Sequence, residues 1–171
     1  MTNHPDRSHL DIQGMADYLS TQPDIDAAYI FGSEARGQAL PWSDVDIAVL
    51  FKPGSDDASL MARQLELMGE LQDFTSREVQ VVILNHAPPQ LAYEVVRHGR
   101  LLCQGDELAR IRFEVRAMKL FFDIAPMLAA YDRALAKRIQ EVGLGSRRGT
   151  YPDAVGAAER IYRRLTQFAR R

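Results

Sequence analysis

Residues 31–51 read FGSEARGQALPWSDVDIAVLF, and this stretch decides the fold. Its second half, DVDIAVLF, is short and rich in Val, Ile, Leu and Phe, which predicts a β-strand. Side chains alternate between the two faces of a strand, so Asp44 and Asp46 are expected on one face, roughly 6 to 7 Å apart along the backbone. The opposite face is apolar throughout and is expected in the core: Val45, Ile47, Val49 and Phe51.

A glycine-serine turn precedes this strand. The segment AAYIF at residues 27–31 predicts another strand, which leads directly into Gly32. A glycine permits unusual φ values and allows a ligand to approach the main chain closely. Ser33 adds a backbone N–H and a hydroxyl, and consecutive N–H groups at such a corner form a nest that binds anions. We therefore expect a phosphate at this turn.

The order of the turn and the acidic strand along the chain is more specific than either feature alone. A Gly-Ser pair alone is typical of an ordinary turn, and Asp-x-Asp alone is typical of a solvated strand face. Strand, turn, short spacer and acidic strand together predict a site for a phosphate and a metal ion. Oxygen ligands in near-octahedral geometry suit Mg²⁺, so Asp44 and Asp46 are the expected metal ligands.

Composition and length are those of a small globular protein. The chain has 171 residues, of which 46% are hydrophobic and 26% charged, enough for one compact domain with a real core. It contains no apolar run of about 18 residues and does not open on a secretory leader, so a cytoplasmic protein without a membrane partner is expected. Cys103 is the only cysteine, which excludes an internal disulfide, and its apolar neighbours predict a buried thiol.

Charge is unevenly distributed along the chain. The net charge is −2, yet residues 143–171 hold seven arginines against two acidic residues, a net of +5. Residues 143–150 resemble a linker, and the apolar residues after them recur at helical spacing, which predicts a basic amphipathic helix. That helix would dock a partner, contact RNA or rest on its own domain, and the sequence leaves these alternatives open.

The remaining pattern predicts an α+β fold, a small mixed β-sheet flanked by helices with a helical C-terminal part. Further strands are expected at residues 78–84 and 100–103. Helices are expected at these ranges: 8–21, 56–74, 88–97, 106–124 and 127–142. Pro126 should break or kink the last helical stretch, because proline cannot donate to the helical ladder. We divide the chain into a core at 8–104, C-terminal helices at 105–142, and a linker with the basic helix at 143–171.

An apolar seam runs along the predicted helix at 106–124. Its members are Leu108, Ile111, Val115, Met118 and Phe122. The seam is interpreted as core, with a partner-binding groove as the alternative, because exposed apolar stripes mark interfaces.

The stretch GSEARGQALPWSDVD at residues 32–46 resembles a known signature. Gly-Ser, ten residues and Asp-x-Asp form the pattern of the DNA polymerase β-like nucleotidyltransferase superfamily. Residues 81–103 and 112–132 are similar to the MNT branch, the minimal nucleotidyltransferases that serve as antitoxins beside HEPN ribonuclease toxins. The resemblance covers most of residues 10–135.

This resemblance implies the polymerase β-like nucleotidyltransferase fold and a function. ATP would be the substrate, with its phosphates at Gly32 and Ser33, and a tyrosine of a cognate HEPN toxin would accept AMP. Arg36 is expected to contact a phosphate or to pin the spacer, and Ser43 to shape the entry of the strand. The implied cofactor is Mg²⁺, and the implied partner is the toxin. The sequence leaves open whether the protein forms a homo-oligomer.

One position departs from the family pattern. Members usually carry a third carboxylate on the next strand, whereas this chain has Gln80 in the segment VQVVILN. A two-metal site places its ions about 3.5 to 4 Å apart. Without the third carboxylate the second ion loses a ligand and the reaction loses its candidate base. Glu78 lies two residues earlier on the same face, either as a substitute or, as we favour, as an exposed strand-end charge.

The candidate catalytic residues are therefore Asp44, Asp46, Glu78 and Gln80. The leading hypothesis is an adenylyltransferase antitoxin that neutralises its toxin by AMPylation. Gln80 favours a second hypothesis, an antitoxin with weakened catalysis that neutralises the toxin by binding it. A third is a nucleotidyltransferase that modifies a small molecule such as an aminoglycoside.

Overall fold

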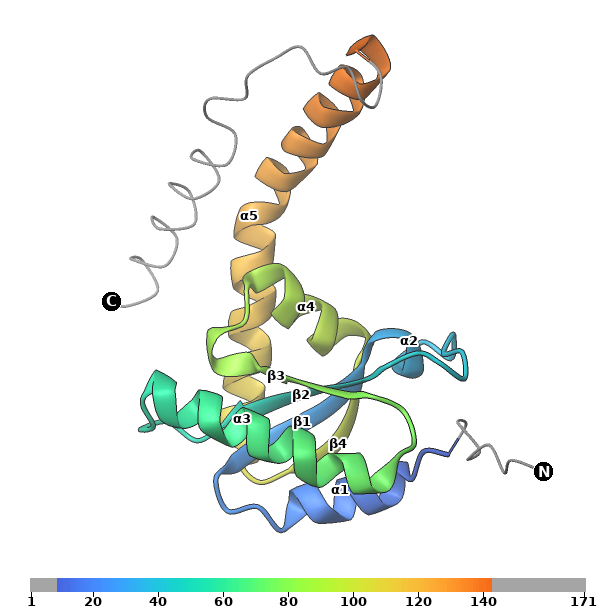
Figure 1. Cartoon of the computed structure of the whole chain (residues 1–171). Coiled ribbons are helices and arrows are strands. Elements are labelled where there is room, and N and C mark those ends of the chain that lie inside the picture. Colours follow the sequence, from blue (N-terminus) through green and yellow to red (C-terminus); the bar gives the residue numbers. More distant parts are fainter. Residues whose placement is uncertain (1–8, 143–171) are drawn as a thin grey trace, which may run out of the picture. The chain divides into compact units, whose positions relative to one another are not determined.

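The computed structural model describes residues 9–142, which form a sheet with helices on both faces (Figure 1). The elements follow in this order: α1 (Ile12–Ser20), β1 (Ile25–Phe31), α2 (Gly32–Ala35), β2 (Val45–Phe51), α3 (Asp57–Leu71), a 3₁₀ turn η1 (Gln72–Phe74), β3 (Val79–Ile83), a 3₁₀ turn η2 (Leu84–His86), α4 (Pro89–His98), β4 (Arg100–Gln104) and α5 (Glu107–Val142). No helix in this part of the chain is long and apolar enough to cross a membrane.

The sheet is mixed, as the sequence predicts. Its four strands lie in the order β3-β2-β1-β4. β1 runs antiparallel to β2 and to β4, and β2 runs parallel to β3. The parallel pair is joined through α3, because parallel neighbours need a crossover longer than a hairpin. β1 and β2 are consequently the two central strands, and they carry the Gly32 turn and the paired aspartates at adjacent ends.

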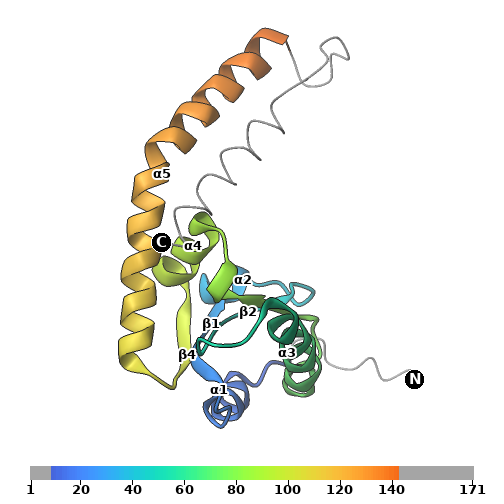
Figure 2. The same ribbon diagram turned by 90° about the vertical axis from the view of Figure 1, so that its left-hand side faces the viewer.

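Apolar residues cover both faces of the sheet. The first core contains Val45, Ile47, Val49 and Phe51, which confirms the prediction for that side of β2, and it packs against side chains of α1 and α3. The second core contains Ala48 and Leu50 from the aspartate side of β2, together with Val95 of α4 and the adjoining Phe113 of α5. Figure 2 shows α3 on one side of the sheet and α4 with the first turns of α5 on the other.

The chain divides after Pro126 into two compact units, and the part of α5 from Met127 onward belongs to the second. The helix assignment continues through Pro126, so the predicted break does not end the helix there. Residues 1–8 and 143–171, which include the predicted linker and basic helix, lie outside the described part.

The interpretation of the α5 seam as core is wrong. Leu108, Val115 and Phe122 are 63%, 56% and 60% exposed, and Ile111 and Met118 are also exposed. The face of α5 that packs on the sheet is a different one, and it carries Phe113 and the buried Ala117. The periodic pattern correctly predicted a helix with an apolar face, but α5 has two such faces and only one is covered by the described residues.

Candidate active site

The glycine turn and the acidic strand meet where β1 ends and β2 begins. Phe31, the last residue of β1, pairs with Asp46 of β2, so Gly32 lies directly beside that aspartate. Gly32 has a φ of 67°, a left-handed conformation that favours glycine. A Cβ built on Gly32 would overlap Oδ2 of Asp46 and lie 3.1 Å from its Cγ. The missing side chain is therefore what allows the main chain and the carboxylate to lie against each other.

Asp44 and Asp46 form a partly buried acidic pair. Burial raises the pKa of the Asp46 carboxyl, the negative charge of Asp44 raises it further, and the positive charge of Arg36 offsets part of this increase. Desolvation and a like charge both disfavour the ionised form, which explains this direction. Two carboxylates that repel each other in this way suit a bound cation, and their oxygen atoms suit Mg²⁺. The residues present therefore fit one divalent ion.

Gln80 and Glu78 occupy different positions at this site. The register of β2 and β3 places Gln80 beside Asp46, and its Nε2 donates a hydrogen bond of 2.9 Å to Oδ2 of Asp44. Glu78 is exposed and precedes the first residue of β3, although its carbonyl accepts a 2.8 Å hydrogen bond from the N–H of Val45. Among residues 9–142 there is no group of three or more His, Cys, Asp or Glu that could hold a metal ion. The site thus offers two carboxylates and one amide.

The other predicted site residues lie in α2 and the spacer. Ser33 is half-buried in the first turn of α2, and its carbonyl accepts a 2.9 Å hydrogen bond from Gln38, which turns the chain back toward the spacer. Arg36 is exposed at the end of α2 and is close enough to influence the pKa of Asp46. Ser43 closes a tight turn, because its hydroxyl accepts from the N–H of Leu40 and its own N–H donates to the Leu40 carbonyl, both at 2.9 Å.

Arg77 is a residue of the site that the sequence pattern did not indicate. It is almost fully buried, and its Nη2 lies 2.7 Å from a carboxylate oxygen of Glu34, the residue after Ser33. Its Nη1 makes a longer contact of 3.5 Å with the carbonyl of Leu40. One guanidinium therefore holds α2 and the spacer, the two segments that separate the glycine turn from the aspartates.

No signal in the sequence alone could have found this contact. Arg77 and Glu34 are 43 positions apart, and an arginine next to the start of a predicted strand is normally exposed. Only the register of β2 and β3 brings the two charges together.

A glycine bend lies against paired carboxylates on the central strands of a mixed sheet, the arrangement expected of a nucleotidyltransferase. The family described as polymerase beta nucleotidyltransferase matches residues 13–108, more than half of the chain. The chain therefore belongs to this family, and the polymerase β-like fold inferred from residues 32–46 is confirmed.

Comparison with similar proteins indicates which branch of the family this chain resembles. The protein adenylyltransferase MntA of Aphanizomenon flos-aquae (strain 2012/KM1/D3) is 29% identical over 105 residues, which cover 57% of this chain and 70% of that protein. A crystal structure of a toxin–antitoxin with AMP-PNP has a chain that is 25% identical, with a TM-score of 0.58, covering 72% of this chain and 98% of that chain.

A further crystal structure, of a mutant of the toxin–antitoxin MntA-HpeT, has a chain that is 26% identical, with a TM-score of 0.59 and coverage of 74% and 98%. The resemblance to MNT proteins is thereby confirmed.

Proposed function

We propose that this protein transfers AMP from ATP to a tyrosine of a cognate HEPN ribonuclease toxin and thereby neutralises it. The observation that carries the proposal is the packing of the Gly32 main chain against Asp46, with Asp44 two residues away on the same face. Support also comes from the similar proteins, one of which is an adenylyltransferase and another a toxin–antitoxin with a bound ATP analogue.

The chain's own residues have distinct roles in this reaction. Main-chain N–H groups of the Gly32–Ser33 turn would donate to phosphate oxygens, and the half-buried site would strengthen these contacts by limiting competition from water. Asp44 and Asp46 would hold Mg²⁺, which when bound supplies positive charge to the triphosphate. Arg77 would keep α2 and the spacer in place, so that the donors and the carboxylates face the same phosphates.

The transfer itself breaks one bond and forms one. The tyrosine oxygen bonds to the α-phosphorus, the bond from that phosphorus to the bridging oxygen breaks, and pyrophosphate leaves. The phenolic proton passes to water, because the Gln80 amide has no basic group to receive it. Most of the rate acceleration would then come from orientation and electrostatic stabilisation.

A second candidate function rests on the contact between Gln80 and Asp44. The amide donates to Oδ2 of Asp44 and so occupies one of the acceptor positions that a cation would use. In this alternative the protein neutralises its toxin by binding alone, with a nucleotide site that does not turn over.

Intact mass measurement separates the two functions. The toxin is incubated with the full chain, Mg²⁺ and ATP, and its ribonuclease activity is measured in the same samples. AMP transfer is expected to raise the toxin mass by one or more AMP units. Asp44→Asn should abolish this increase, whereas Asp73→Asn, a change at an exposed aspartate of η1, should not. Neutralisation without a mass change, equal for wild type and Asp44→Asn, would overturn transfer and support binding alone.

A further inference from the structure

The exposed seam of α5 is an apolar surface without a partner among the described residues. We define the α5 stripe as these five residues: Leu108, Ile111, Val115, Met118 and Phe122. Their spacing alternates between three and four positions, the pattern of a seam that packs against another helix. Every member is exposed, although the stripe lies within the compact unit that ends at Pro126.

The stripe points away from the sheet. Phe113 adjoins the second core, and Ala117 is 3% exposed. Val115 is two positions from each of them, which is about 200° around an α-helix. Glu114 fixes this orientation, because it accepts a 2.8 Å hydrogen bond from the hydroxyl of Tyr29 and pairs with Arg110 at 2.6 Å. Rotation of α5 to bury the stripe would break this network.

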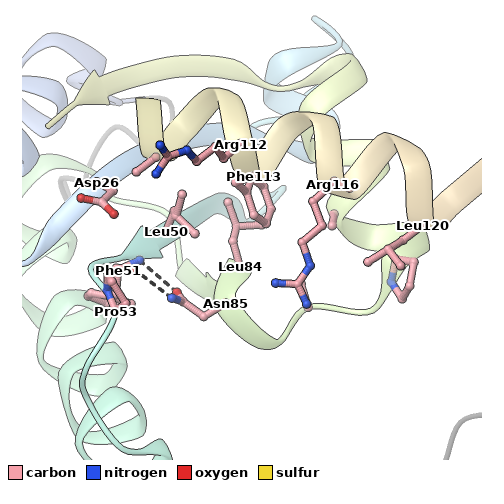
Figure 3. Close-up of a pocket in the computed structure, with 15 residues that line it drawn as sticks. Asp26, Leu50, Phe51, Pro53, Leu84, Asn85, Arg112, Phe113, Arg116 and Leu120 are labelled. Carbon is pink, nitrogen blue, oxygen red and sulfur yellow. Dashed lines mark hydrogen bonds between the residues drawn. The ribbon is translucent and has the colours of Figure 1, made fainter. Parts of the chain in front are cut away.

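Basic side chains line one flank of the stripe. Arg112, Arg116 and Lys119 are exposed, and none forms an ion pair with any other described residue. Arg112 and Arg116 also border a cavity of about 290 Å³, whose apolar lining includes Leu50, Leu84 and Phe113. Figure 3 shows both arginines extending from α5 at this cavity, with Arg112 directed toward Asp26. On α5 the basic residues therefore lie between the exposed stripe and the face that lines the cavity.

We propose that the α5 stripe and its basic flank dock a helix of the partner protein, one with an apolar seam bordered by carboxylates. Charge complementarity determines this choice, because acidic side chains would pair with Arg112, Arg116 and Lys119 beside an apolar seam that covers the stripe. The identification of this partner as the HEPN toxin rests on the proposed function.

Two other occupants conflict with the charges. The segment 143–171 of this chain has a net charge of +5 and would bring arginines to an already basic flank. A second copy packed antiparallel around Val115 would place Arg112 of each chain near Lys119 of the other. Like charges at these flanking positions disfavour a helix pair.

Binding is measured without ATP, so that the result does not depend on catalysis. The full chain is titrated with purified HEPN toxin by calorimetry, and its own mass in solution is measured by light scattering. Val115→Asp places a charge at the centre of the stripe and is expected to weaken binding at least about 30-fold. Arg116→Glu is expected to weaken it about tenfold and to reduce its dependence on salt.

Leu65→Asp provides the matched control. Leu65 is 68% exposed on α3, so the same kind of change is made on a helix at the opposite face of the sheet, and binding should be unchanged. Thermal unfolding of each variant tests the fold, which Val115→Asp should preserve because this side chain contacts solvent. A benzophenone attached to Met118→Cys should crosslink to a toxin peptide that contains acidic and apolar residues at helical spacing.

The outcomes distinguish this inference from the proposed function. Equal affinity of wild type and Val115→Asp for the toxin overturns the stripe as the docking surface and leaves AMP transfer untouched. Toxin binding that depends on Val115 supports the stripe even when no AMP is transferred. The inference is overturned in favour of a second copy if the wild-type chain does not bind the toxin but forms a dimer, and if Val115→Asp converts that dimer to monomers.

Discussion

Gly32→Ala is expected to impair both folding and catalysis, for two separable reasons. The first is conformational, because the φ of 67° at this position costs an L-residue about 1–2 kcal/mol. The second is steric, because the new Cβ would overlap Oδ2 of Asp46. The carboxylate would then have to rotate away from the position in which it lies beside the glycine turn.

Gly37→Ala separates these two effects. Gly37 has a φ of 66°, nearly that of Gly32, but a Cβ placed there would meet no atom within 4 Å. Both variants should therefore lose about 1–2 kcal/mol of unfolding free energy, whereas only Gly32→Ala displaces the carboxylate. A displacement of about 1 Å at a reacting site costs on the order of 100-fold in rate, so this is the expected loss of AMP transfer for Gly32→Ala.

The assay combines urea unfolding with initial rates of AMP transfer to the toxin, followed by mass spectrometry. Calorimetric titration with α,β-methylene-ATP and Mg²⁺, in the absence of toxin, reports on the nucleotide site without catalysis, because the bond that AMP transfer would break is replaced in this analogue. Equal transfer rates for the two alanine variants, at equal unfolding free energies, would refute the role assigned to the contact between Gly32 and Asp46. A large loss of transfer in Gly37→Ala would show that backbone conformation alone accounts for the effect.

Three further predictions concern residues around the sheet. Arg77→Ala leaves Glu34 unpaired, so it should lower the unfolding free energy by about 2–3 kcal/mol and raise the KM for ATP. Arg77→Lys should restore part of the lost unfolding free energy and part of the change in KM. An unchanged KM in Arg77→Ala would contradict a positioning role. Burial raises the pKa of Asp26, and Asp106 raises it further, so the native state releases its proton later than the unfolded state and loses stability as the pH rises above about 4. Asp26→Asn should consequently be more stable than wild type in urea at pH 7, with a difference that shrinks toward pH 4; a constant difference would exclude this cause. Burial raises the pKa of the Cys103 thiol to about 11, so native protein at pH 8 should react with iodoacetamide roughly 100-fold more slowly than protein in urea, and equal rates would show an accessible thiolate.

The alternation of apolar and charged residues along β2 correctly predicted one buried face of the strand, but it gave no sign that the other face is also buried. Val45, Ile47 and Val49 were expected inside because their neighbours Asp44 and Asp46 are charged, and they belong to the first core. Ala48 and Leu50 on the other face are also buried, because α4 and α5 cover that side beyond the aspartates. A two-residue period shows which residues share a face, whereas the covering of that face depends on elements more than 40 residues later.

The same limit explains the α5 stripe. Apolar residues at intervals of three and four predict a helix with an apolar face, but the pattern is the same whether that face packs on the protein's own sheet or on another protein. Phe113 and Ala117 gave a weaker signal in the sequence than Val115 and Phe122, yet they form the packed side. The polar contact of Glu114 with Tyr29 decides the orientation, and a hydrogen bond across 85 positions leaves no local pattern.

Charge balance at the active site connects Gln80 to the choice between catalysis and binding. A third carboxylate at this position would give the site three negative charges, one more than a single divalent ion balances and one fewer than two such ions carry. With Gln80 the pair Asp44 and Asp46 carries at most two charges, and a single divalent ion balances them. The amide bond takes one acceptor position on Asp44, but a carboxylate has about four, so the remaining lone pairs can still contact a cation. Under the proposed function, Gln80 would remove a ligand of a second ion without removing the ligands of the first, so the nucleotide would still bind and turnover would depend on the orientation of the tyrosine.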